Sequence, residues 1–96
     1  MKHFMIEVTY LVPKEQILTV RPEHRAYLQK GYAGGMLLMS GAQSSGKGGI
    51  VIARAASLAE LEGFFKDDPY QIQKLVSYRF VEFEPAQWQE CLKDWI

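Results

Sequence analysis

The chain has 96 residues, with eleven basic and eleven acidic side chains and a formal net charge of zero. This length suits one modest hydrophobic core, so we expect residues 1–96 to form a single α+β domain that ends in a tail over 85–96. A neutral chain has no long-range field to attract nucleic acid or an anionic membrane, and we expect neither partner.

Cysteine usage and the first residues bear on the cellular compartment. Cys91 is the only cysteine, which argues against a disulfide framework and favours a reducing environment. The N-terminus lacks the succession of basic, apolar and small residues that export signals have. No apolar run approaches the roughly 20 residues needed to cross a bilayer. We therefore expect a soluble, cytoplasmic protein.

Residues 2–10 alternate between apolar and mixed positions, which predicts a strand that is covered on one face. We expect a cleft to form over the mixed face and the histidine near its start to be solvated. The apolar face comprises Phe4, Ile6, Val8 and Tyr10, and the mixed face comprises His3, Met5, Glu7 and Thr9.

The next segment predicts a helix that begins near Thr19 to Pro22. Proline inside a helix costs about 3 kcal/mol, whereas proline in the first turn is tolerated. A histidine so near the start would lie at the positive end of the helix dipole, which favours the neutral imidazole. The inward stripe of this helix is predicted to comprise Val20, His24, Tyr27, Leu28 and Gly31.

Glycines at 31, 34 and 35 end this helix. Residues 36–40 and 49–54 then predict two strands, joined by a loose glycine- and serine-rich turn over 41–48. The turn is one residue short of a P-loop. A P-loop leads into a helix, however, and here a strand follows, which argues against nucleotide binding.

The segment Ser57-Leu58-Ala59-Glu60 is a capping box, which predicts a helix that ends at Asp68 because a residue before proline leaves helical geometry. Pro69 can begin a short second helix over 69–75, with Asp68 as its N-cap. The first of these helices is predicted to bury Leu58, Leu61, Phe64 and Phe65.

Residues 76–84 alternate again and predict a fourth strand, which Pro85 ends. Residues 86–96 are predicted to be helical. The resulting order βαββαβ is that of the ferredoxin-like unit, an antiparallel sheet with both helices on one face. Because the other face is rich in apolar side chains, we expect two sheets to pack against each other in a homodimer.

The RNA-recognition motif shares this order of elements, and it needs aromatic and basic residues on its open sheet face. Residues 49–53 carry no aromatic side chain, which argues against RNA binding. Three or four ligands at a metal-binding spacing are also missing, so we expect no metal and no cofactor.

His24 is the main candidate for chemistry, as a general acid or base. The alternative is a satisfied core histidine. Asp68 caps a helix on any interpretation, and its second oxygen is free to orient a histidine. A pocket between the helix ends and the sheet is predicted to involve Arg21, Tyr27, Ser40, Gly41 and Tyr70, each of which can otherwise be a packing or surface residue.

Three short motifs stand in register on this order of elements: Arg-Pro-Glu-His-Arg-Ala-Tyr-Leu at 21–28, Ser-Gly-Ala at 40–42 and Asp-Pro-Tyr at 68–70. With them, nearly the whole chain resembles the YciI-like (YCII-related) family. The resemblance implies a dimeric α/β barrel of ferredoxin-like halves and an active site that contains His24 and Asp68. Most members have no assigned reaction, although one relative dehydrochlorinates a chlorinated hydroxyhydroquinone.

These observations lead to two hypotheses. The first is a cofactor-independent enzyme of the lyase or isomerase kind that transfers protons on a small cyclic or aromatic molecule, as in dehydrochlorination or lactone isomerisation. His24 would act as base or acid, and Asp68 would hold its tautomer and orientation. The second is a non-catalytic dimer that binds a small metabolite or serves in regulation.

Overall fold

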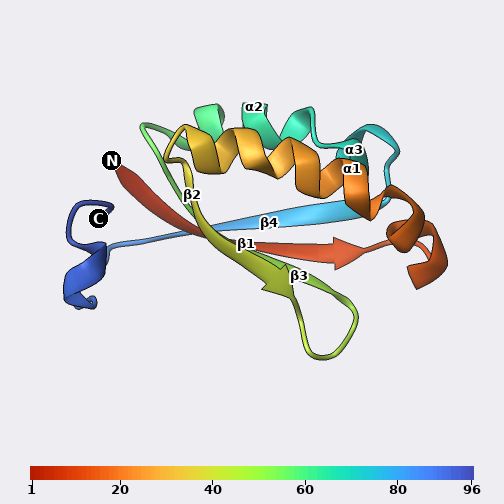
Figure 1. The fold of residues 1–96 in the computed structure, drawn as a ribbon, viewed down its shortest axis with the longest axis horizontal. Coiled ribbons are helices and arrows are strands. Elements are labelled where there is room, and N and C mark those ends of the chain that lie inside the picture. Colours follow the sequence, from red (N-terminus) through yellow and green to blue (C-terminus); the bar gives the residue numbers. More distant parts are fainter.

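The computed structural model describes all 96 residues. One antiparallel sheet has the strand order β2-β3-β1-β4, and the helices cover one of its faces (Figure 1). This arrangement confirms the predicted ferredoxin-like α+β fold. The elements are β1 (Lys2–Tyr10), α1 (Lys14–Ala33), β2 (Leu37–Ala42), β3 (Gly48–Ala55), α2 (Leu58–Lys66), α3 (Pro69–Ile72) and β4 (Val76–Phe83), followed by a 3₁₀ turn, Glu90–Leu92.

The hydrophobic core lies between the sheet and the helices. As the alternation predicts, Phe4, Ile6 and Val8 of β1 point into it and are at most 4% exposed. In the paired strands, Ala53 lies opposite Phe4 and Val51 lies opposite Ile6. The central strand therefore presents one apolar face to the helices, with β3 and β4 on its two sides.

Helix α1 begins at Lys14, so the predicted start near Thr19 to Pro22 is wrong and Pro22 lies inside the helix. Ile17 and Val20, in the two turns before the proline, are 0% and 7% exposed. Burying two such side chains contributes about 3 to 6 kcal/mol, which matches or exceeds the roughly 3 kcal/mol that an internal proline costs. Tertiary packing therefore outweighs the local preference.

Gly31 allows α1 to approach the strand that follows it. A Cβ atom at this position would lie 2.7 Å from Leu37 Cγ and 2.9 Å from Phe64 Cζ, closer than real contacts allow. The absence of a side chain brings α1 against β2 and α2 at once.

Helix α2 begins at the predicted capping box. Ser57 Oγ accepts a hydrogen bond from the Glu60 amide at 3.1 Å, and the Glu60 carboxylate accepts one from the Ala56 amide at 3.1 Å. Leu61 and Phe65 are buried, but Leu58 is 40% exposed because it opens the first turn at the surface. Its predicted burial is wrong.

The segment after β4 is not the helix that the sequence predicts. It contains only a 3₁₀ turn, Glu90–Leu92, and its end is held by Trp95. Trp95 Nε1 donates to the Gly35 carbonyl at 3.1 Å, and Arg54 Nη1 donates to the Trp95 carbonyl at 2.6 Å. A helix of about eleven residues is marginal on its own, so these anchoring contacts decide the path.

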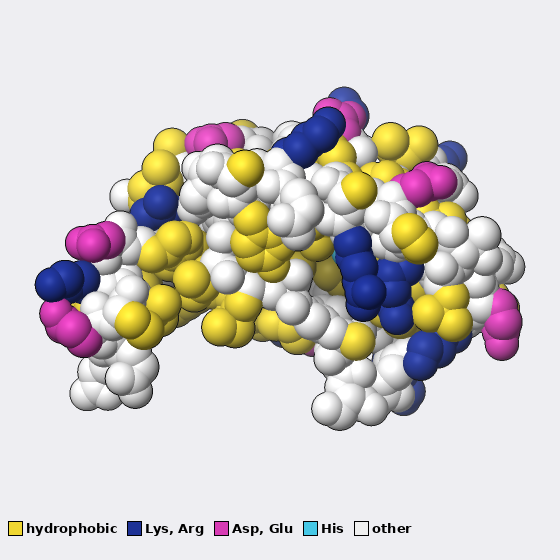
Figure 2. Space-filling view, in the orientation of Figure 1, with side chains coloured by type: hydrophobic (Ala, Val, Ile, Leu, Met, Phe, Trp, Pro, Cys, Tyr) yellow, Lys and Arg dark blue, Asp and Glu magenta, His cyan; other side chains and the backbone are white.

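The face of the sheet opposite the helices carries no α-helix of this chain, and the C-terminal segment covers it only where Trp95 packs on His3. Figure 2 shows this underside as a hollow between the C-terminal segment and the β2–β3 hairpin, with hydrophobic side chains along it. Met39 and Phe83 are 58% and 42% exposed, and the register places Met5, Ile52 and Val81 in one row across three strands. None of the helices has both the length and the apolar character of a membrane span.

Candidate functional site

A histidine and a carboxylate that lie 44 residues apart in the chain meet beneath α1. His24 Nδ1 is 2.8 Å from both Asp68 Oδ1 and Asp68 Oδ2. The Asp68 side chain is completely buried, whereas 14% of the His24 side chain is exposed. An ionised carboxylate only accepts hydrogen bonds, so Nδ1 of the imidazole donates and Nε2 carries the lone pair.

Asp68 receives two further donors. The Tyr70 amide donates to Oδ1 at 3.0 Å, which makes Asp68 the predicted N-cap of α3. The Tyr78 hydroxyl donates to Oδ2 at 2.9 Å. With the histidine, three donors converge on this carboxylate, which is the arrangement that a buried anion needs. The cap and the histidine partner are thus the same side chain.

Tyr78 is the most strongly perturbed titratable group near this pair. Burial, first, and then the neighbouring Asp68 charge raise the pKa of Tyr78 far above the ordinary tyrosine range. The phenol therefore keeps its proton and remains a donor to the carboxylate. Charge-assisted bonds of this kind are stronger than neutral ones, so Tyr78 holds Asp68 in place.

Tyr70 and Arg21 complete the surroundings of the histidine. The Tyr70 ring stacks on His24, with centroids 3.8 Å apart and planes at 9°. Arg21 Nε donates to the Tyr70 hydroxyl at 3.5 Å, and Arg21 Nη2 donates to the Tyr10 hydroxyl at 3.2 Å. The bond to Tyr70 is the main cause that raises the pKa of Arg21, with Tyr10 adding to it, so the guanidinium stays charged.

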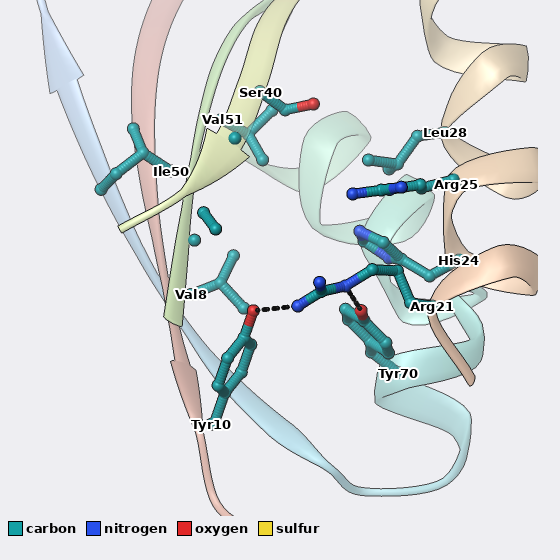
Figure 3. A pocket seen from close by; sticks show the side chains of 13 residues that line it. Val8, Tyr10, Arg21, His24, Arg25, Leu28, Ser40, Ile50, Val51 and Tyr70 are labelled. Carbon is teal, nitrogen blue, oxygen red and sulfur yellow. Dashed lines mark hydrogen bonds between the residues drawn. The ribbon is translucent and has the colours of Figure 1, made fainter. Parts of the chain in front are cut away.

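A cavity of about 120 Å³ opens beside the histidine, between α1 and the strands. Figure 3 shows Arg21, His24 and Arg25 reaching from the helix toward the sheet, with Tyr10 and Tyr70 at the lower end. The thirteen lining residues are Val8, Tyr10, Arg21, His24, Arg25, Leu28, Ser40, Gly41, Ala42, Gly49, Ile50, Val51 and Tyr70.

Four of the five predicted pocket residues line this cavity: Arg21, Ser40, Gly41 and Tyr70. Ser40 Oγ shares a 2.6 Å hydrogen bond with the Tyr32 hydroxyl. Tyr27 lies elsewhere, and its predicted place in the pocket is wrong. Its hydroxyl donates to the Phe64 carbonyl at 2.6 Å and its ring stacks on Phe64, so this side chain joins α1 to α2.

Two further expectations need correction. The cleft was predicted over the mixed face of β1, but the cavity lies on the apolar face, where Val8 and Tyr10 line it. The helix dipole was also expected to keep His24 neutral. His24 lies ten residues after Lys14, about 15 Å along the axis, and the dipole effect is confined to the first turn. Its partner Asp68, rather than the dipole, dominates its surroundings.

The sequence interpretation did not single out Tyr10, Arg25 or Tyr78. A usable signal existed for the two tyrosines, because both fall on the inward face of an alternating strand, where a phenol hydroxyl needs a partner. Arg25 follows His24 directly, and an arginine in a helix is ordinarily a surface residue. Its position against the cavity depends on how α1 lies across the sheet.

His3 was predicted to be solvated and is only 7% exposed. Its ring packs edge-on against Trp95 at 5.6 Å and lies 6.5 Å from the Phe83 ring, and Nε2 has no hydrogen-bond partner. Burial, followed by the charges of the N-terminus and Arg54, lowers the pKa of His3. No group of three or more His, Cys, Asp or Glu side chains is placed to hold a metal ion.

The fold and the buried histidine–aspartate pair define a class, a small ferredoxin-like α+β protein with a polar pocket between its first helix and its sheet. The YCII-related domain model matches residues 2–84. The chain belongs to the YCII-related family, as the resemblance in the sequence indicated.

Among solved structures, the chain is similar to the 5-chloro-2-hydroxyhydroquinone dehydrochlorinase TftG from Burkholderia phenoliruptrix AC1100, in complex with 2,5-dihydroxybenzoquinone. The TM-score is 0.68 at 21% sequence identity, covering 91% of this chain and 93% of the other. At this identity the likeness shows a shared fold. No curated protein sequence matches the chain.

Proposed function

We propose that this protein is a cofactor-independent enzyme that moves protons on a small cyclic or aromatic molecule, with His24 as the base or acid. The observation that carries the proposal is the contact of His24 Nδ1 with both Asp68 oxygens at 2.8 Å. That contact selects the tautomer in which Nε2 is basic. A fixed tautomer beside a cavity is what general base catalysis needs.

Proton uptake at Nε2 turns His24 into an imidazolium ion. The buried Asp68 carboxylate stabilises that charge, because it lies 2.8 Å away and is shielded from water. The Tyr70 ring stacks on the imidazole of His24, with the ring centroids 3.8 Å apart, and this stacking keeps the imidazole from tilting. The proton can return from Nε2 to a different atom of the substrate, which is an isomerisation. Alternatively, a leaving group departs as the proton is taken, which is an elimination.

The contacts of His24 favour proton transfer over nucleophilic catalysis. Neither a serine hydroxyl nor a cysteine thiol is hydrogen-bonded to its ring. Ser40, which also lines the cavity, is engaged with Tyr32, and Cys91 lies exposed in the C-terminal segment. A histidine that activates a nucleophile normally lies within hydrogen-bond reach of it.

The similar structure supports the kind of substrate. TftG is by name a dehydrochlorinase, and it was solved with 2,5-dihydroxybenzoquinone, a single six-membered ring. Dehydrochlorination requires that a base remove a proton while chloride leaves, and it needs no redox partner. The same pair of side chains would serve lactone isomerisation, in which a proton moves from one carbon to another.

The test is turnover of a defined panel, chlorinated hydroquinones and small unsaturated lactones, followed in D₂O by proton NMR and by chloride release. We expect at least one compound to react. His24→Gln is expected to slow the reaction by about 10²- to 10⁴-fold, the usual contribution of a general base. Glu23→Gln, an exposed neighbour on the same helix, is the matched control and keeps full activity.

Two outcomes would count against this proposal. Unchanged turnover in His24→Gln would remove the histidine from the mechanism. Compounds that bind at the cavity without any proton exchange or chloride release would favour the second hypothesis, a dimer that binds a metabolite without transforming it.

We also propose that two copies pair through the open face of the sheet. Met5, Ile52 and Val81 form an apolar row there, and an exposed apolar patch of this kind marks an interface. The double variant Ile52→Lys, Val81→Lys is expected to be monomeric in light scattering. Leu18→Lys, on the helical side where Leu18 is 48% exposed, is the matched control and stays dimeric. A wild-type monomer would contradict the proposal.

A further inference from the structure

The wall of the cavity carries positive charge that no neighbouring carboxylate balances. Arg21 and Arg25 are the only lining residues with a permanent charge, and no aspartate or glutamate is among the thirteen. Asp68 lies behind His24 and is fully buried. Neither arginine has a carboxylate partner, since the other ion pairs of the protein are Lys2–Glu82, Arg79–Glu7 and Lys93–Glu90.

Arg21 is held in place by neutral groups. Its Nη2 donates to the Tyr10 hydroxyl at 3.2 Å and its Nε donates to the Tyr70 hydroxyl at 3.5 Å. Two phenols orient a guanidinium, but they do not neutralise it. A guanidinium has five N–H donors in a rigid fork, so this tether leaves donors free to bind a carboxylate. The Arg21 side chain is therefore already ordered before a ligand binds, so binding loses little further side-chain entropy.

Apart from Ser40, whose hydroxyl is bonded to Tyr32, the walls of the cavity on the side of the sheet are apolar or bare backbone. Gly41 and Gly49 contribute only backbone, and the volume of about 120 Å³ lies below the roughly 150 Å³ of an apolar cavity that accepts benzene. An occupant therefore has the size of one small ring, with part of that ring projecting through the mouth. The aliphatic lining residues are Val8, Leu28, Ala42, Ile50 and Val51.

We propose that this pocket selects a small organic anion, a single-ring or short-chain carboxylate, whose charged group binds Arg21 while Arg25 supports it at the mouth. This inference rests on the proposed function, because it assigns the substrate class of the same site. Neutral ring compounds of the same shape are expected to bind more weakly.

Anchoring at Arg21 would also serve the proton transfer. Positions 21, 24 and 25 lie on one side of α1, at the spacings of three and four residues that place side chains next to one another. A carboxylate on Arg21 thus brings the adjoining carbon atoms beside His24. The free ring nitrogen of that histidine is Nε2, because Nδ1 is bound to Asp68.

The test compares benzoate with benzamide, which share a ring and a shape and differ in charge. Each is titrated into the wild-type protein labelled with ¹⁵N, and the amide shifts of residues around the cavity, such as Ser40 and Gly49, report binding. We expect benzoate to bind at least about ten-fold more tightly, the effect of one or more charge-assisted hydrogen bonds.

Variants assign the preference to particular side chains. Arg21→Met is expected to abolish the preference for benzoate. Arg21→Lys keeps the charge and loses the fork, and is expected to retain only part of it. Arg25→Met is expected to reduce it less. Lys66→Met removes the same charge from the exposed end of α2 and is the matched control, with the preference unchanged.

Equal binding of the two compounds, no binding of benzoate, or binding away from the cavity would each overturn the inference. So would an unchanged preference in a folded Arg21→Met. None of these results touches the proposed proton transfer, which is tested on uncharged ring compounds with His24→Gln. Conversely, a preference for benzoate together with unchanged turnover in His24→Gln would support the anion site and contradict only the catalytic proposal.

Discussion

The two histidines of this chain lie in two contrasting regions of the molecule. His24 lies beside the cavity, with its Nδ1 on a fully buried carboxylate and its ring against Tyr70. His3 lies at the other face of the sheet, under Trp95, with Nε2 buried and unpartnered. Its charged neighbours are the N-terminus and Arg54, both positive.

Burial by itself does not make a histidine functional. Both rings are shielded from water, but only His24 has an acceptor that stabilises a positive charge and an open cavity on its other side. His3 is surrounded by aromatic rings and by cations, which disfavour its protonation. Its environment suits packing, whereas that of His24 suits proton exchange.

The largest expected effect separates the two histidines directly. His24→Gln is expected to lower turnover of a panel compound by about 10²- to 10⁴-fold. His3→Gln is expected to leave turnover within about two-fold, since that ring is remote from the cavity and an effect on folding alone would be small. The measurement is the initial rate by NMR at saturating substrate. Equal losses in the two variants would erase the distinction.

Substitutions of Asp68 separate its role as the N-cap of α3 from its role as the negative partner of His24. Asp68→Asn keeps an N-cap of equal quality, so its free energy of unfolding is expected to change by no more than about 1 kcal/mol while activity falls as in His24→Gln. Asp68→Ala loses the cap and leaves the Tyr78 hydroxyl without a buried acceptor, which is expected to cost about 2 to 4 kcal/mol. Urea unfolding measures both. Full activity in a folded Asp68→Asn would reduce the aspartate to a cap.

Tyr78→Phe tests the support of the histidine–aspartate pair, because it removes one of the three hydrogen-bond donors on Asp68. We expect a loss of about 1 kcal/mol in stability and about ten-fold in kcat, with KM nearly unchanged, since the phenol acts through the carboxylate and does not line the cavity. Tyr27→Phe, which removes the bond to the Phe64 carbonyl, is the matched control. It is expected to cost similar stability without the loss in kcat.

The smallest expected effect is a decrease in the free energy of unfolding at acid pH, caused by His3. Its pKa is lowered in the folded protein, so between the ordinary value of 6.5 and the folded value the unfolded chain binds more protons. Stability is therefore unaffected above about pH 7 and falls as the pH drops below 6.5. His3→Phe removes this component.

The measurement is urea unfolding from pH 7.5 to pH 5 at one protein concentration, for wild type and His3→Phe. The advantage of the variant is expected to grow as the pH falls, since all other titrating groups are shared. A difference between the two proteins that stays the same at every pH would show that His3 is not held neutral by its surroundings.

Local patterns predicted most of the fold. The alternation in β1 and β4, the capping box before α2 and the Asp-Pro cap before α3 all lie where the sequence places them. Each rests on contacts within four residues, which spacing alone reveals. Helix α1 is the exception, because burial of Ile17 and Val20 outweighs the local cost of Pro22.

The site was predicted in part. The family motifs pointed to His24 and Asp68, and the structure places them in contact. The roles of Tyr78 and Arg25 were not visible, since a tyrosine in a strand and an arginine in a helix have many ordinary positions. Tyr27 was misplaced because the inward stripe of α1 faces both the sheet and α2, and spacing along one helix does not say which.

By itself, the sequence determined the elements, their order and the residue types available for chemistry, because periods of 2 and 3.6 residues are local properties of the backbone. Only the tertiary structure decided which histidine meets a carboxylate and which is sealed beneath a returning tail. Contacts between residues 44 positions apart, as for His24 and Asp68, depend on how whole elements pack. That packing is set by the burial of the entire core, which no short segment encodes.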